Sequence, residues 1–217
     1  MARSKLAKFK EIAESDLVLE AGKPLFENIK GKWHESYFQN DYPIILEIGC
    51  GKGDYTIGMA NLFPNKNFIG VDIKGSRIWK GSCLAQEQGL TNVAFLRNFI
   101  ELLPEQFAPG EISEIWITFP DPRPRKGEEK KRLTSTRFLD IYESLLKPSS
   151  LIHFKTDDLA LFEFTLDLLK MREAKNLRYT FDLYASDLQQ NTLGIQTTYE
   201  KRFLAEGQTI KYLQYTR

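Results

Sequence analysis

The sequence predicts an α/β fold in which one doubly wound, mostly parallel sheet is covered by helices and has an antiparallel C-terminal edge strand. Two observations support this prediction. Short apolar runs of strand length alternate with helix-length segments from residue 44 to residue 171, which is typical of parallel sheets with helices on both faces. After residue 178 this alternation stops, and the remaining segments fit strands at the edge of the sheet.

Five apolar runs rich in β-branched and aromatic residues are expected to form the parallel strands. These runs are residues 44–46, 67–71, 93–96, 112–119 and 151–154. Helix-length segments lie between or after them, at residues 55–63, 76–88, 135–146 and 159–171. Each of these helices follows a strand, which is the order that a parallel sheet with covering helices requires.

The C-terminal part of the chain has a different pattern. Residues 179–184 and 210–215 fit two further strands. Between them lie a polar loop at 186–194 and a short helical segment with Tyr199 and Phe203 at i, i+4 spacing. The two late strands are expected to pair antiparallel or at an edge, where they close the sheet.

Residues 1–40 lack a strong pattern and are expected to form a basic N-terminal extension. Its basic residues include Arg3, Lys5, Lys8 and Lys10. Residues 41–217 are expected to form one domain, because a chain of this length can bury most of its apolar surface in a single core. No apolar run approaches the roughly 18 to 20 residues of a membrane span, and the N-terminus lacks the apolar segment of a signal peptide. We therefore expect a cytoplasmic protein without a membrane partner.

The composition narrows the classes of function. With 42% hydrophobic and 27% charged residues, the chain lies far from the disordered class and is expected to fold throughout. Cys50 and Cys83 are too few for a disulfide framework or a structural zinc site, and no metal is expected. The net charge of +1 argues against nucleic-acid binding unless basic residues cluster locally.

A glycine-rich turn follows the first strong strand, where residues 44–53 read IILEIGCGKG. Glycines such as Gly49 and Gly51 allow the backbone to approach a ligand closely and to turn sharply into the next helix. Their Gly-x-Gly-x-Gly spacing differs from the Gly-x-Gly-x-x-Gly spacing of dinucleotide-binding enzymes. Such a turn can also be an ordinary tight loop, so its interpretation depends on the neighbouring strand ends.

Polar residues mark the carboxyl ends of the next strands. Asp72 lies about twenty residues after the turn, where a carboxylate can accept hydrogen bonds from both ribose hydroxyls, although it could also be a helix N-cap or a solvated strand end. Asn98 offers a donor and an acceptor that suit an adenine edge, or it could simply form a turn. Glu47 lies inside the first strand, so its carboxylate is expected to face a cationic ligand group or a backbone donor. Together these strand ends predict one ligand-binding crevice.

A loop stiffened by prolines follows the fourth strand. Pro120, Pro122 and Pro124 restrict the backbone and hold Asp121 at a defined position. Six basic residues follow within a dozen positions: Arg123, Arg125, Lys126, Lys130, Lys131 and Arg132. A run of mixed charge is often only a solvated face, but a rigid acid beside a basic run favours a phosphate-contact patch next to a base pocket.

Four motifs occur along the chain: LEIGCGKG at 46–53, FPDPxP at 119–124, FKTDD at 154–158 and TxYExxFxxxG at 197–207. In this combination they resemble the bacterial tRNA (guanine-N7) methyltransferase family. The glycine turn is shared with most class I methyltransferases, whereas the proline-flanked Asp121 and the late Thr-x-Tyr-Glu block are specific in combination. The resemblance covers the chain from Leu46 to the C-terminus.

The resemblance implies a Rossmann-like class I methyltransferase domain with S-adenosyl-L-methionine as cofactor and a variable-loop guanine of tRNA as substrate. The implied cofactor contacts are Glu47, Asp72, Asn98 and Asp121, to which the glycine turn adds Gly49 and Gly51. Asp121 would also lie at the reacting centre as the catalytic residue. The implied substrate contacts are Arg125, Asp157, Thr197 and Glu200.

Three positions depart from the pattern of the family. Arg123 stands where Trp is usual, which removes a flat stacking surface and adds a charge. Arg125 stands where Lys is common and keeps the positive charge while offering a planar fork. Asp72 replaces the frequent Glu and is one methylene shorter, yet it can still reach a ribose.

The chemistry of N7 methylation limits what the acidic residues have to do. Guanine N7 already carries a lone pair, so no base has to remove a proton before it attacks a methyl group. Asp121 is therefore expected to orient the purine and stabilise its developing charge, as an acceptor for guanine N–H groups, rather than to act as a general base.

Several alternatives stay open at the level of the sequence. Asp157 could cap the helix that starts near residue 159, and Thr197 with Glu200 matches a capping box at a helix start. The chain could also be a class I methyltransferase that acts on a small molecule or a protein, or a non-catalytic RNA-binding protein of the same fold.

Overall fold

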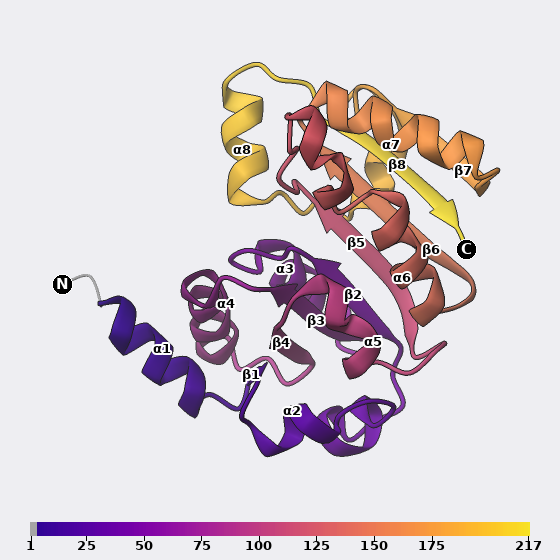
Figure 1. Ribbon diagram of the computed structural model, residues 1–217. Coiled ribbons are helices and arrows are strands. Elements are labelled where there is room, and N and C mark those ends of the chain that lie inside the picture. Colours follow the sequence, from indigo (N-terminus) through magenta and orange to yellow (C-terminus); the bar gives the residue numbers. More distant parts are fainter. Residues whose placement is uncertain (1–3) are drawn as a thin grey trace.

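Eight strands form a single mixed sheet in the computed structural model, which describes residues 4–217. The strands are β1 (Val18–Glu20), β2 (Ile44–Ile48), β3 (Asn67–Asp72), β4 (Val93–Arg97), β5 (Ile112–Thr118), β6 (Leu146–Thr156), β7 (Lys175–Thr180) and β8 (Lys211–Thr216). Their order across the sheet is β1-β4-β3-β2-β5-β6-β8-β7 (Figure 1). Strands β1 to β6 pair parallel, whereas β8 is antiparallel to both β6 and β7. The predicted mostly parallel α/β sheet is confirmed, and its antiparallel strand lies just inside the edge strand β7.

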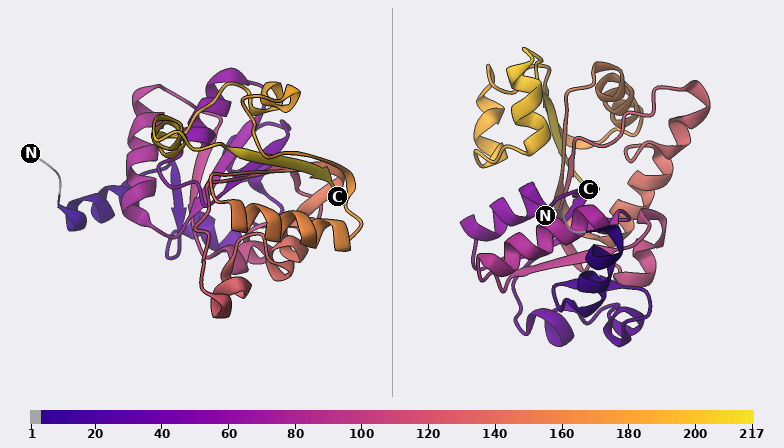
Figure 2. Two further views of the ribbon diagram at one scale, coloured as in Figure 1. Left: turned by 90° about the horizontal axis from the view of Figure 1, so that it is seen from above. Right: turned by 90° about the vertical axis from the view of Figure 1, so that its left-hand side faces the viewer.

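Helices cover both faces of this sheet (Figure 2). They are α1 (Lys5–Glu14), α2 (Pro24–Asn28), α3 (Asp54–Leu62), α4 (Gly75–Glu87), α5 (Leu103–Gln106), α6 (Thr136–Leu145), α7 (Leu159–Met171) and α8 (Thr198–Ala205). Apolar residues of α2, α5, α6 and α7 belong to the core cluster on one face, and those of α1, α3, α4 and α8 belong to the cluster on the other. The four predicted helices match α3, α4, α6 and α7 to within one residue at each end.

Strand β2 shows why its sequence is continuously apolar. Leu46 and Ile48 belong to one core cluster and Ile45 belongs to the other, since successive side chains of a strand point to opposite faces. All three side chains are buried, because helices cover both faces of the parallel part of the sheet.

Strand β7 lies four residues before the strand predicted at 179–184. The difference arises from a turn that ends β7. The backbone N–H of Asp182 donates to Thr180 Oγ1 at 3.1 Å, and the N–H of Tyr184 donates to Asp182 Oδ1 at 3.1 Å. Such side-chain hydrogen bonds compete with strand pairing.

The described part of the first forty residues contributes to the sheet and to its core. Strand β1 pairs parallel with β4, and Ile12 and Trp33 are fully buried. The sequence did not predict β1, because three residues are too short to show a periodic pattern. The domain boundary at residue 40 stays a prediction, and Arg3 lies outside the described residues.

The carboxyl ends of β2, β3, β4, β5 and β6 lie at the same edge of the sheet, because these strands are parallel. The polar residues predicted at these strand ends are thereby brought to one side of the molecule. In the part of the chain that the structure describes, no helix has both the length and the apolar character needed to cross a membrane.

Candidate active site

The loop between β2 and α3 adopts a conformation that requires glycine. Gly49, Gly51 and Gly53 have φ angles of 71°, 58° and 73°, a left-handed region that L side chains rarely adopt. The N–H of Gly49 donates to Val71 O at 2.8 Å, which ties the loop to the end of β3. A Cβ atom at Gly53 would lie 2.6 Å from a ring carbon of Phe95. The loop therefore lies close against the end of the sheet.

Asp72 at the end of β3 orients this glycine loop. Its Oδ2 accepts a hydrogen bond from Gly51 N at 3.0 Å, and its Oδ1 accepts one from Lys74 N at 2.8 Å. The residue is 8% exposed, so it is not a solvated strand end, and the N-cap of α4 is Lys74 rather than Asp72. Each carboxylate oxygen can accept a further hydrogen bond, so ribose hydroxyls can bind without disturbing the loop.

Asn98 and Asp72 line a cavity of about 360 Å³, which we call the Asn98 cavity. Asn98 Oδ1 accepts a hydrogen bond from Phe99 N at 2.9 Å. Its Nδ2 is buried and has no hydrogen-bond partner anywhere in residues 4–217. A buried donor without a partner is costly, so this group fits an acceptor atom of a bound ligand, such as an adenine ring nitrogen.

Glu47 is 2% exposed and lies in the wall of a second cavity. Its carboxylate accepts hydrogen bonds from Thr56 N at 2.8 Å, from Thr56 Oγ1, and from Thr118 Oγ1 at 2.7 Å. The backbone N–H of Thr56 is therefore the donor that was expected to face the Glu47 carboxylate. Burial raises the pKa of Glu47 to about 7, although the hydrogen bonds from Thr56 and Thr118 oppose this shift.

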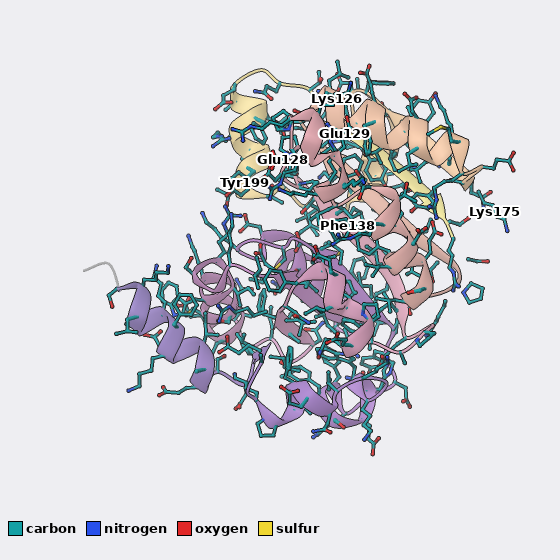
Figure 3. The ribbon with its side chains drawn as sticks, in the orientation of Figure 1. Lys126, Glu128, Glu129, Phe138, Lys175 and Tyr199 are labelled. Atoms are coloured by element: carbon teal, nitrogen blue, oxygen red, sulfur yellow. The ribbon has the colours of Figure 1, made fainter. Side chains whose placement is uncertain are left out.

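This second cavity encloses about 370 Å³ and is called the α8 cavity, because α8 and its N-cap supply one wall. That wall consists of Thr197, Tyr199, Arg202 and Phe203. Tyr199 lies at the end of α8 nearest to α3 and α4 (Figure 3). The Asn98 cavity and the α8 cavity share six lining residues: Gly49, Lys74, Arg77, Phe119, Pro120 and Asp121. The two cavities therefore meet at the glycine loop and Asp121.

Asp121 lies at this junction on a constrained loop. Phe119 and Arg123 both have a φ angle of 48°, which is unusual for residues with side chains. Asp121 Oδ1 accepts a hydrogen bond from Arg123 N at 3.2 Å, and Oδ2 lies 3.3 Å from Arg123 Nε. Its side chain is 64% exposed, so a substrate can reach it.

Arg132 holds the same loop from inside, and the prediction that it binds phosphate is wrong. The residue is 7% exposed, and its guanidinium lies 4.4 Å from the ring centroid of Phe164. Its Nε donates to Pro122 O at 3.2 Å, and its Nη2 donates to Arg123 O at 3.4 Å. The guanidinium therefore forms its hydrogen bonds within the protein and is not available to bind a phosphate.

The remaining basic run lies mainly on the surface, around the 3₁₀ segment Lys126–Lys131. Glu128 pairs with Arg123 at 3.7 Å and with Lys131 at 3.3 Å. Arg125 is exposed and lines neither cavity, so the structure does not bring it together with the other candidate residues. Figure 3 labels Lys126, Glu128 and Glu129 on this segment.

Asp157 lines the α8 cavity and does not cap a helix. The N-cap of α7 is its neighbour Asp158, whose Oδ1 accepts a hydrogen bond from Leu161 N at 2.7 Å. The capping alternative for Asp157 is therefore wrong. Burial raises the pKa of the Asp157 carboxyl, and the nearby Asp158 charge adds to this effect.

Thr197 caps α8 by accepting a hydrogen bond from Glu200 N at 3.1 Å, which confirms its capping alternative. Glu200 does not return a hydrogen bond to Thr197. Its carboxylate pairs with Lys155 Nζ at 2.8 Å and accepts a hydrogen bond from the Tyr184 hydroxyl at 2.9 Å. Both charged side chains are 0% exposed, so the structure places Glu200 behind the wall of the α8 cavity rather than in it.

Besides Arg202 on α8, three basic residues that the sequence did not single out line the α8 cavity: Lys52, Lys74 and Arg77. Lys52 lies in the glycine turn, and the other two follow Asp72 by two and five positions. Their positions near two predicted strand ends were the feature of the sequence that could have identified them.

The chain is similar over nearly its whole length to bacterial methyltransferases. Residues 41–213 match a family described as "Putative methyltransferase". A tRNA (guanine-N(7)-)-methyltransferase of Cytophaga hutchinsonii is 50% identical over 217 residues, which cover 99% of this chain and 98% of the relative. The enzyme of the same name in Listeria monocytogenes is 40% identical over 188 residues, which cover 87% of this chain and 86% of the relative.

Solved structures support the same fold at low sequence identity. The 16S rRNA methyltransferase KamB matches with a TM-score of 0.63 and 17% identity, and the match covers 86% of this chain and 92% of KamB. A 16S rRNA (adenine(1408)-N(1))-methyltransferase from Catenulisporales acidiphilia, solved with S-adenosylmethionine, matches with a TM-score of 0.57 and 14% identity, covering 86% of this chain and 90% of the other. With the glycine turn, Asp72, Asn98 and the Asp121 loop in place, the matches along the chain show that it belongs to the tRNA (guanine-N(7)-)-methyltransferase family.

Proposed function

We propose that this protein transfers the methyl group of S-adenosyl-L-methionine to N7 of a variable-loop guanine in tRNA. The meeting of the two cavities at Gly49 and Asp121 carries this proposal. One cavity offers polar strand ends that suit an adenosine, and the other offers aromatic and acidic side chains that suit a purine base. The names of relatives up to 50% identical agree with this reaction. Since tRNA is the substrate, the protein is expected to act in the cytoplasm.

In the Asn98 cavity, the cofactor would be held by the groups at the ends of β3 and β4. Asp72 would accept hydrogen bonds from the ribose hydroxyls, and the unpaired Asn98 Nδ2 would donate to the adenine. Gly49 and Gly51 would let the backbone approach the amino-acid part of the cofactor. When bound, S-adenosylmethionine supplies an electrophilic methyl group on a cationic sulfur. Glu47 would lie near that positive charge, which favours the ionised form of its carboxyl.

In the α8 cavity, the target guanine would lie against aromatic side chains and face two carboxylates. Phe119, Tyr199 and Phe203 line the cavity and offer surfaces for base stacking. Asp121 and Asp157 can accept hydrogen bonds from guanine N1–H and the exocyclic amine. These contacts become stronger as the purine gains positive charge, so they stabilise the transition state more than the bound substrate.

The other predicted substrate residues would act less directly. Thr197 fixes the start of α8, and Glu200 positions that helix through its buried pair with Lys155. Arg125 would contact a phosphate outside the two cavities, because it lies on the exposed basic run.

Incubation of the protein with labelled S-adenosylmethionine and unmodified tRNA tests the proposed function. Nuclease digestion should yield labelled N7-methylguanosine, and a tRNA that lacks the variable-loop guanine should not be labelled. Label in a small molecule or a protein would favour the second kind of methyltransferase. Tight tRNA binding without any label would favour a non-catalytic RNA-binding protein.

Asp72→Ala is expected to weaken binding of S-adenosylmethionine about 10- to 150-fold, as the loss of roughly 1.5–3 kcal/mol implies. The variant removes the ribose acceptor and also releases the N–H of Gly51 in the glycine loop. Asp72→Asn keeps one acceptor oxygen and should lose less affinity. Titration calorimetry measures the effect, and Asp167→Ala, which removes an exposed carboxylate on α7, is the control. Unchanged affinity in Asp72→Ala would remove this residue from the cofactor site.

Neutralising Arg125, Lys126 and Lys130 together is expected to reduce the salt dependence of tRNA binding. These residues are the exposed cations of the basic run that have no carboxylate partner in residues 4–217. Each lost phosphate contact should lower the slope of log affinity against log salt by about 0.7–0.9.

A matched control removes three exposed lysines that line neither cavity, Lys147, Lys170 and Lys175. Both triple variants lower the net charge by three, so a general charge effect would change both slopes equally. A slope that stays at the wild-type value in the Arg125, Lys126 and Lys130 variant would show that the basic run is only a solvated face.

A further inference from the structure

Lys52, Lys74 and Arg77 converge on the α8 cavity. All three line this cavity, and Lys74 and Arg77 also line the Asn98 cavity. None of their side chains forms an ion pair or a hydrogen bond with any residue from 4 to 217. Lys52 and Arg77 are half-buried, so their charges are only partly hydrated.

The carboxylates near these cations have their contacts with other groups. Asp54 Oδ2 accepts hydrogen bonds from Thr198 N at 2.7 Å and Thr198 Oγ1 at 2.6 Å. Asp72 accepts from the backbone of Gly51 and Lys74, and Asp121 pairs with Arg123. Glu47 and Asp157 also line the α8 cavity, and Glu47 accepts hydrogen bonds from Thr56 and Thr118. Within residues 4–217, no carboxylate forms an ion pair with any of the three cations.

The start of α4 adds to the positive potential at the same place. Lys74 is the N-cap of this 13-residue helix, and no side chain caps its N-terminus. No acidic residue occurs in the first turn of the helix. The partial positive charge of a helix N-terminus therefore adds to the charges of Lys74 and Arg77.

We infer that Lys52, Lys74 and Arg77 form a site for the backbone phosphates of the target nucleotide and its neighbour. This inference rests on the proposed function, because it takes the α8 cavity as the place of the guanine. A base stacked near Tyr199 and Phe203 brings its own phosphodiester groups to the cavity mouth. Arg77 can bind two phosphate oxygens through its planar fork, and the two lysines supply point charges.

The cofactor also carries an anion, its carboxylate, but three cations exceed what one carboxylate requires. Lys52 lines only the α8 cavity, whereas Asp72 and Asn98 line only the Asn98 cavity. Lys52 therefore lies away from the proposed adenosine contacts. It lies beside Gly51, where the amino-acid part of the cofactor would approach, so the excess of three cations over one carboxylate is what favours a phosphate of the substrate as a bound group.

The test compares Lys52→Ala/Arg77→Ala with the wild type in tRNA binding at several salt concentrations. The slope of log affinity against log salt should fall by about 1.4–1.8 for the two lost contacts. Affinity for S-adenosylmethionine, measured by calorimetry, should stay within twofold of the wild-type value. Arg77→Lys keeps the charge and should retain most of the wild-type slope.

Lys147→Ala/Lys175→Ala is the matched control, since it also removes two positive charges, and both residues are exposed and line neither cavity. Lys175 lies on the edge strand β7, on the opposite side of the molecule from Tyr199 (Figure 3). This control should keep the wild-type slope.

Two results would overturn the phosphate site: an unchanged slope in the double variant, or a loss of cofactor affinity without a loss of tRNA affinity. The second result would assign the cations to the cofactor carboxylate. The proposed function fails separately, if wild-type protein binds tRNA but forms no N7-methylguanosine. Because the slope is a binding measurement, it tests the phosphate site whether or not methyl transfer occurs. Wild-type protein that does not bind tRNA would refute both proposals.

Discussion

Asp121→Asn is expected to fold normally and to keep most of its tRNA affinity, while methyl transfer slows on the order of 100-fold or more. Asparagine preserves the size of the side chain and can still accept the hydrogen bond from Arg123 N. It replaces one acceptor oxygen with a donor and removes the negative charge. A guanine N–H would then face an N–H group or an uncharged acceptor, which weakens stabilisation of the positively charged purine.

The structure gives two reasons to expect a large effect at this position. Asp121 lies where the two cavities meet, so it is close to the proposed place of methyl transfer. The loop that carries it is constrained by three prolines and by hydrogen bonds from the buried Arg132, so the loop cannot easily rearrange to compensate. Positioning effects of this kind are sensitive to small displacements.

Single-turnover methyl transfer across pH, with tRNA and cofactor binding measured separately, tests this role. Glu128→Gln is the matched control, because Glu128 also faces Arg123 from the same loop but lines neither cavity. Because N7 needs no deprotonation, the residual activity of Asp121→Asn should show no pH dependence assignable to a catalytic base. A variant that binds both partners and methylates at the wild-type rate would refute the assigned role.

Lys155→Met is expected to lower the free energy of unfolding by about 3–5 kcal/mol, because it leaves the buried Glu200 carboxylate without its partner. Burial lowers the pKa of Lys155, and the Glu200 charge opposes this shift. The pair joins the sheet strand β6 to the helix α8, which supplies one wall of the α8 cavity. Urea denaturation monitored by circular dichroism measures the loss of stability.

A second variant separates stability from the position of α8. Lys155→Met/Glu200→Gln removes both charges and keeps an acceptor for the Tyr184 hydroxyl, so it should recover most of the lost stability. Its KM for tRNA should be higher than that of the wild type while cofactor affinity is unchanged, because α8 is no longer held by the ion pair. A wild-type KM would show that Glu200 does not position α8.

An exposed ion pair provides the comparison for stability. Arg178 and Asp187 lie 2.8 Å apart, with side chains that are 51% and 72% exposed. Arg178→Met should therefore cost less than about 1 kcal/mol. Equal decreases in the free energy of unfolding for Arg178→Met and Lys155→Met would show that the buried pair contributes no more to stability than the exposed pair.

Local patterns in the sequence were sufficient to predict most of the fold. The apolar run of β2 and the helical segments of α3, α4, α6 and α7 have a clear length and period, and the structure places them where predicted. The glycine turn and the strand-end position of Asp72 are also local features, because a parallel α/β sheet brings strand ends to one edge. Strand β1 has only three residues, so its place depends on pairing with β4, which is distant in sequence.

The partners of charged side chains were decided only by the tertiary structure. The sequence analysis predicted that Glu200 contacts the substrate and that Arg132 contacts a phosphate. In the folded protein, Glu200 pairs with Lys155, and Arg132 donates hydrogen bonds to the backbone of the Asp121 loop. The same packing leaves Lys52 and Arg77 without a partner in residues 4–217. The physical reason is that periodicity and turn chemistry act between near neighbours, whereas the free energy of a charge depends on burial and on groups from distant segments.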